Sequence, residues 1–154
     1  MRRADREISG RSEIENIIEK TDVCRIAIAN DNFPYIVTMN FGYKADPKPC
    51  IYFHCAREGK KLEMIAGNNH VCFEMDTDHK IYSGKNGCDW GMKFSSVLGY
   101  GNIFIVTEKS EKTYGLNCIM KHYGGEGEYL YDEKIFENTL VLRLDILEMT
   151  GKRK

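Results

Sequence analysis

The chain has 154 residues, a length typical of one domain with its own hydrophobic core. Hydrophobic residues make up 42% and charged residues 29%, which excludes the composition of a disordered chain. The 22 basic and 23 acidic residues leave a net charge of −1, so the sequence gives no support to a nucleic-acid or anionic-membrane surface. We therefore predict one domain over residues 1–154, with neither nucleic acid nor membrane as a partner.

No segment of the sequence reads as a targeting or membrane-spanning signal. The opening residues MRRADREISGR are basic but lack the apolar run that a secretory signal needs. No apolar run approaches the roughly 20 residues that span a bilayer. The expectation is a cytoplasmic protein.

Apolar periodicity and turn residues divide the chain into alternating helices and strands. Ser12 and Glu15 have the spacing of a capping box, and the isoleucines that follow predict a helix over residues 12–20. A turn at residues 31–34 joins two strand-like runs into a hairpin. The predicted strands cover residues 23–29, 35–43, 50–56, 70–75, 95–107 and 140–149. Further helices are predicted over residues 59–67 and 116–123, and a glycine-rich loop over residues 83–93.

The short connections between these strands limit the possible architectures. A parallel doubly wound sheet would need a helical crossover between every strand pair, and the chain has no GxGxxG motif. Two architectures remain open from the residues alone. One is a closed or split antiparallel barrel with peripheral helices, and the other is an open α+β sheet.

Six cysteines occur without the paired spacing of a zinc ribbon or a redox CxxC motif. We expect five of them to pack as small hydrophobes in regular structure, as free thiols. These five are Cys24, Cys50, Cys55, Cys72 and Cys118. Cys88 falls in the loop, and the sequence leaves its reactivity open. His70 and Cys72 share a strand face, but a metal site would need a third ligand, so we predict no metal.

The stretch from Pro34 to Lys61 carries the strongest functional signal. It places His54 at the end of a strand and Lys60 and Lys61 at the start of a helix. Backbone N–H groups at a helix N-terminus carry partial positive charge and favour a phosphate group. The alternative is a hairpin followed by two solvated lysines.

Side-chain alternation constrains how this stretch can meet a ligand. His54 and Cys55 are neighbours in a strand, so they face opposite sides, and Phe53 lies on the side of Cys55. The side chain of His54 is the preferred ligand contact, although a histidine satisfied within the core remains an alternative. Thr38 shares one face with Asn40, and we expect this polar face to meet the ligand.

Several segments together resemble the pyridoxamine 5′-phosphate oxidase-like flavin proteins, and within them the 5-nitroimidazole antibiotic resistance (Nim) branch. The segments extend over most of the chain, and the block IYFHCAREGKK is the most specific of them. They are PYIVTMNFGY (34–43), IYFHCAREGKKLEMI (51–65), VCFEMD (71–76), SSVLGYGN (95–102), IMKHYGG (119–125) and LEMTGK (147–152). The resemblance implies a mainly β (α+β) fold, a six-stranded antiparallel split β-barrel with peripheral helices. It also implies FMN as cofactor and a homodimer with the flavin at the interface.

The resemblance further implies a flavin site. Residues 37–40 are expected along the isoalloxazine, residues 53–55 beside the ribityl chain, and the two lysines at the phosphate. The serines of the long strand are expected to offer hydroxyl groups to the flavin. The full set is Val37, Thr38, Met39, Asn40, Phe53, His54, Cys55, Lys60, Lys61, Ser95 and Ser96. The family often has an arginine before this serine position, whereas here Lys93 and Phe94 precede Ser95, and lysine lacks the bidentate fork.

The implied activity is that of an FMN-dependent oxidoreductase acting on a nitroaromatic or similar small oxidised substrate. The flavin would carry the chemistry, so no protein acid, base or nucleophile is assigned. One alternative is a non-catalytic flavin-binding or redox-sensing protein. Another is an enzyme of the same fold that uses a deazaflavin, haem or pyridoxine phosphate. Trp90 is either a loop anchor or a cover for the flavin of the partner subunit.

Overall fold

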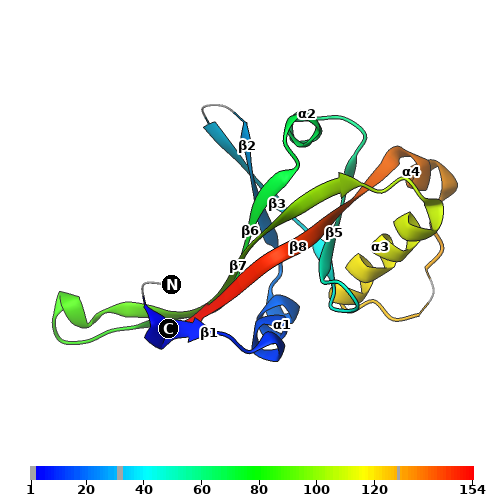
Figure 1. Cartoon of the computed structure of the whole chain (residues 1–154). Coiled ribbons are helices and arrows are strands. Elements are labelled where there is room, and N and C mark those ends of the chain that lie inside the picture. The colour runs from blue at the N-terminus through cyan, green and yellow to red at the C-terminus, as the bar shows by residue number, and fades with distance from the viewer. Residues whose placement is uncertain (1–2, 31–32, 128) are drawn as a thin grey trace.

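A computed structural model describes residues 3–30, 33–127 and 129–154, which form one curved antiparallel sheet with helices around it (Figure 1). The strands are β1 (Glu7–Ile8), β2 (Cys24–Asn30), β3 (Phe33–Met39), β4 (Phe41–Lys44), β5 (Cys50–Ala56), β6 (His70–Tyr82), β7 (Gly91–Ile105) and β8 (Thr139–Arg153). The helices are α1 (Arg11–Lys20), α2 (Lys60–Gly67), α3 (Lys109–His122) and α4 (Glu133–Asn138), with short 3₁₀ turns at Ala4–Arg6 and Gly87–Asp89. The strand order is β3-β2-β6-β7-β8-β5-β4, and β1 pairs with β8.

The antiparallel, mainly β fold is confirmed, but its strand count differs from the prediction. The described residues form eight strands where six were expected. Asn40 divides the run predicted as one strand over residues 35–43 into β3 and β4. The reason is that β3 pairs with β2 whereas β4 pairs with β5, so the chain leaves one edge of the sheet for the other at Asn40.

Two local predictions also need correction. The capping box at Ser12 is absent because α1 begins one residue earlier, with Gly10 as N-cap and no side-chain cap. Glu15 instead accepts hydrogen bonds from Arg11 and Tyr43. The segment 83–93 is only partly a loop, since β7 begins at Gly91 and forms with β6 a hairpin that extends away from the sheet (Figure 1).

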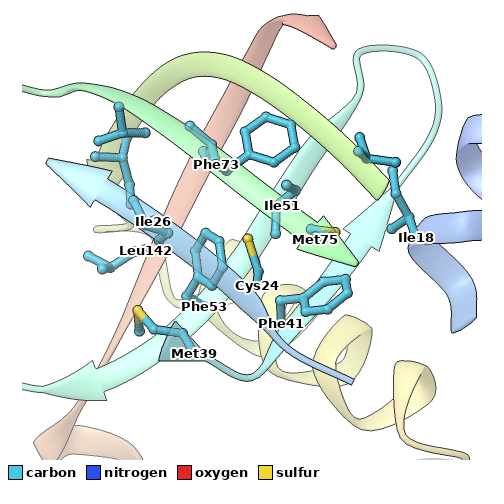
Figure 2. Close-up of a cluster of buried hydrophobic side chains, with 14 of the residues drawn as sticks. Ile18, Cys24, Ile26, Met39, Phe41, Ile51, Phe53, Phe73, Met75 and Leu142 are labelled. Atoms are coloured by element: carbon cyan, nitrogen blue, oxygen red, sulfur yellow. The ribbon is translucent and has the colours of Figure 1, made fainter. Parts of the chain in front are cut away.

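The main hydrophobic core lies inside the curve of the sheet. Figure 2 shows Phe41 of β4, Phe53 of β5, and Phe73 and Met75 of β6 gathered with Ile18 of α1. These side chains are fully buried, and each contributes about 1.5–3 kcal/mol to folding relative to an exposed position. The sheet therefore curves because it wraps this cluster.

A second, smaller core fills the space between β5 and α3. It contains Cys50 and Tyr52 of β5 together with Ile119 of α3. The alternate residues Ile51 and Phe53 belong to the main core, so β5 is buried on both faces. Within the part of the chain that the structure describes, no helix is long and apolar enough to cross a membrane.

Helix α3 packs against β4 with backbone contact at Gly42. A Cβ atom at this position would fall inside contact distance of the Cys118 backbone. We expect Gly42→Ala to lower the free energy of unfolding by about 1–3 kcal/mol, because α3 must shift outward. Urea unfolding measures the change, with Gly87→Ala as control since a Cβ atom there meets nothing within 4 Å. Equal effects of the two substitutions would contradict close packing at Gly42.

Candidate functional site

The site is built where the chain leaves β5 and enters α2. Gly59 is the N-cap of α2 and has φ = 131°, a left-handed conformation that favours glycine. No side chain caps this end of the helix. The first N–H groups of α2, at Lys60 and Lys61, are therefore free of a capping side chain and can donate hydrogen bonds to an anionic ligand.

The two lysines lie near β3 and β5. The Lys60 ammonium lies 4.9 Å from the centroid of the Tyr35 ring on β3. Burial raises the pKa of the Cys55 thiol on β5, and the positive charge of Lys61 opposes this shift. Among the described residues neither lysine forms an ion pair, so both charges are available to a ligand.

Strand β3 presents different side chains to its two faces. Val37 and Met39 lie on the same face as Tyr35 and pack on the main core. Thr38 lies on the opposite face, where it pairs across the strand with Arg25. The lysines thus share their side of β3 with the apolar pair and not with Thr38.

The other predicted residues divide in the same way. Phe53 and Cys55 face the main core, whereas the exposed His54 faces the opposite side of β5, as alternation predicted. Asn40 is exposed at the junction of β3 and β4. The structure therefore brings Cys55 near the lysines and leaves His54 on the other face of the strand.

The two serines lie far from the lysines within one chain. Tyr35 on β3 lies opposite Ile28 on β2, and the next partners across the sheet are Val71 on β6 and Gly101 on β7. Ser95 lies six residues along β7 from that point (101 to 95), about 20 Å away. Ser95 is buried and its hydroxyl accepts a hydrogen bond of 3.3 Å from Arg153 Nε, whereas Ser96 pairs with Asp76 across the strands.

An apolar surface covers the outer face of the sheet. Ile36 is 63% exposed and Leu147 is 67% exposed, and Tyr100 lies on the same surface. A groove of about 340 Å³ lies on this face over β2, β6, β7 and β8, and its lining includes Ala27, Cys72, Tyr100 and Leu147. An exposed apolar surface of this kind commonly marks an interface.

Trp90 lies on the extended hairpin of β6 and β7. Its indole N–H donates to the Gly84 carbonyl at 3.1 Å, which fixes the ring, yet the residue remains 58% exposed. Of the two alternatives left open for Trp90, the structure shows the loop anchor. The second alternative, a cover for the flavin of the partner subunit, is taken up with the proposed function.

Residues 10–153 match the sequence profile of the family described as pyridoxamine 5′-phosphate oxidase. The chain belongs to the pyridoxamine 5′-phosphate oxidase family. The resemblance inferred from its segments is confirmed. Among curated proteins, none matches the chain.

Solved structures agree with this family assignment. A candidate 5-nitroimidazole antibiotic resistance protein from Bacteroides thetaiotaomicron is 32% identical, covers 96% of this chain and 86% of its own, and has a TM-score of 0.83. A flavocytochrome from Azotobacter vinelandii is 16% identical, with 100% and 72% coverage and a TM-score of 0.83. An FAD and haem binding protein from Mycobacterium smegmatis is 12% identical, with 97% and 73% coverage and a TM-score of 0.82. The last two share the fold.

Sequence reasoning missed two residues of this candidate site. Tyr35 lies below Lys60, and its position two residues before Val37 could have placed it on the same face. Gly59 sets the left-handed turn into α2, a role that its place before the lysines could have suggested.

All six cysteines are free, and burial separates them by accessibility. Cys24, Cys50 and Cys55 are buried, as predicted, whereas Cys72 and Cys118 are half-buried. Burial raises the pKa of each of these five thiols, so little thiolate is present at neutral pH.

Cys88 is the exposed thiol and we expect it to react first. Titration of the native protein with a thiol reagent should show one fast equivalent, which Cys88→Ser removes. Denatured protein should show six equivalents. Several fast equivalents in native Cys88→Ser protein would contradict the described burial.

Proposed function

We propose that this protein binds FMN and acts as an oxidoreductase. The observation that carries the proposal is the uncapped N-terminus of α2, where Lys60 and Lys61 have no acidic partner among the described residues. A phosphate is the group such a site suits best, because N–H donors, helix dipole and two ammonium groups all favour negative charge.

The residues around the lysines fit the remainder of a flavin. Met39 is buried in the main core and Val37 is half-buried against it, so we place the isoalloxazine along the free edge of β3, beside the backbone groups of these residues. Asn40, exposed at the strand junction, is in our proposal the amide that addresses the polar edge of the ring. Phe53 and Cys55 would contribute backbone groups and packing beside the ribityl chain. When bound, the flavin supplies the redox chemistry, and these residues bind and orient it.

We also propose a homodimer with the flavin at its interface. The outer face of the sheet carries exposed apolar residues that a second copy would cover. A flavin held by Lys60 and Lys61 of one chain would meet Ser95, Ser96 and Trp90 only from the partner, since these residues lie remote from the lysines within one chain. In this arrangement Thr38 and His54 would face the partner or the substrate.

The proposed substrate is a nitroaromatic or similar small oxidised molecule. The support is the 32% identity with the candidate 5-nitroimidazole resistance protein. Turnover with a reduced nicotinamide as electron donor and a nitroimidazole as acceptor tests it. Tight flavin binding without turnover would instead support a flavin-binding or redox-sensing protein.

Haem, a deazaflavin and pyridoxine phosphate are the alternative ligands to FMN. Structural neighbours include a flavocytochrome and an FAD and haem binding protein, and exposed His54 offers an imidazole. Absorption spectra after separate incubation with each ligand distinguish these possibilities. We place the protein in the cytoplasm, since its six free thiols suit a reducing compartment.

The lysine pair gives the sharpest test of FMN binding. We expect the double variant Lys60→Gln, Lys61→Gln to bind FMN at least about tenfold more weakly, because both side chains at the phosphate lose their positive charge. Riboflavin, which lacks the phosphate, should bind both proteins alike. Fluorescence titration measures both affinities, and Lys48→Gln, on an exposed loop, is the control. Equal loss for FMN and riboflavin, or no flavin binding by the unaltered protein, would contradict the phosphate site.

The dimer proposal predicts a difference between two exposed isoleucines. Ile36→Glu places a charge on the outer sheet face, and we expect it to turn a dimer into a monomer of 17.8 kDa. Ile135→Glu on α4 changes a residue of similar exposure, 68%, away from that face, and should leave the dimer intact. Light scattering after gel filtration measures both masses. A monomeric unaltered protein would overturn the proposal.

A further inference from the structure

A separate cleft lies between α1, β4 and α3, away from the lysines of α2. Its volume is about 700 Å³, within the range of small-molecule sites. Its walls include Glu19 of α1, Tyr43 and Lys44 of β4, and Asn117 and Lys121 of α3. The proposed flavin site uses none of these residues.

The cleft has a firmly packed base. The backbone of α3 at Cys118 contacts β4 at Gly42, so the two walls are held at a fixed separation. His122 Nε2 donates to the Thr21 carbonyl at 2.8 Å and its ring packs on Phe41, which ties α3 to the end of α1. A preformed cleft binds ligands without the cost of ordering its walls.

The hydrogen-bond donors of the cleft lack acidic partners. Among the described residues Lys44 and Lys121 form no ion pair, and both positive charges oppose the burial that raises the pKa of Cys118. The Asn117 side-chain oxygen accepts from Tyr131 at 2.7 Å, which leaves its amide N–H groups as donors. Two ammonium groups and one amide thus line the same cleft and are available to an anionic ligand.

The acidic side of the cleft is largely neutralised from within the chain. Glu15 accepts hydrogen bonds from Arg11 at 2.8 Å and Tyr43 at 3.1 Å, and Arg11 also pairs with Asp46. Glu19 is the one cleft carboxylate without such a partner among the described residues. It would disfavour a second negative charge at the α1 side of a ligand, so the cleft favours a monoanion.

The ring of Tyr114 supplies an apolar surface beside these donors. Lys44 Nζ lies 5.3 Å from its centroid, and the ring is partly exposed. Tyr43 adds a second ring on the β4 wall. Aromatic rings beside a positive charge suit an organic acid that carries an aromatic ring.

We propose that this cleft binds a small aromatic monocarboxylate, with its carboxylate at Lys44, Asn117 and Lys121 and its ring against Tyr114. The site stands independently of the proposed flavin site. A ligand bound here bridges α1, β4 and α3, so its binding stabilises the fold by mass action.

The test uses 3-phenylpropionate and its neutral amide, 3-phenylpropionamide, as matched probes. Isothermal titration should show one saturable site per chain for the acid, and binding about tenfold weaker or more for the amide. Adding FMN should leave the affinity unchanged. Failure of FMN to bind would overturn the flavin proposal and leave this measurement valid. Displacement of the probe by FMN would overturn the cleft proposal.

Two substitutions assign the binding to the cleft. Asn117→Asp keeps the acceptor for Tyr131 but replaces the donor by a negative charge, and should reduce the affinity for the acid at least about tenfold. Lys121→Gln changes an exposed side chain, so the fold should be retained. It should weaken binding of the acid but leave binding of the amide unchanged. Lys134→Gln on α4 is the control and should have no effect. Unchanged binding in both cleft variants, or no binding up to about 10 mM probe, would overturn the proposal.

Discussion

The burial of β5 on both faces is the constraint on which the rest of the structure depends. Ile51 and Phe53 fill the main core, while Cys50 and Tyr52 meet α3 on the other side. A strand fixed between two cores has little freedom to shift, because interiors are packed at crystal-like density. The turn after Ala56 therefore starts from a rigid point, and the N-terminus of α2 is held at a defined place beside β3.

The same strand also separates two regions of unpaired positive charge. On the main-core side Lys60 and Lys61 stand at a helix start, next to Tyr35 and Cys55. On the α3 side Lys44 projects from β4, the neighbour of β5, into a different cleft. Positive charges gathered at one place raise the local electrostatic potential and so attract an anionic ligand.

Much of this arrangement follows from local patterns in the sequence. The strand over residues 50–56 has the predicted bounds, and α2 begins within one residue of its prediction, because each has a clear period and a clear break. The opposite orientation of His54 and Cys55 also follows from a period of two. The family signature predicted the antiparallel fold that local patterns alone left open.

The remaining features depend on contacts between segments distant in sequence. Asn40 divides a continuous apolar run only because its two halves pair with different strands. The short α4 was not predicted, since it is six residues long and buries Phe136 alone. Tyr35 meets Lys60 across 25 positions (35 to 60), and no local pattern encodes such a contact.

A structure of the protein with bound FMN would test most directly whether β5 and α2 form a phosphate site. We expect the phosphate at the N-terminus of α2, within hydrogen-bond distance of the first backbone N–H groups and of Lys60 or Lys61, with the isoalloxazine beside β3. A phosphate bound elsewhere, at Arg25 or in the cleft of Lys44 and Lys121, would contradict this placement.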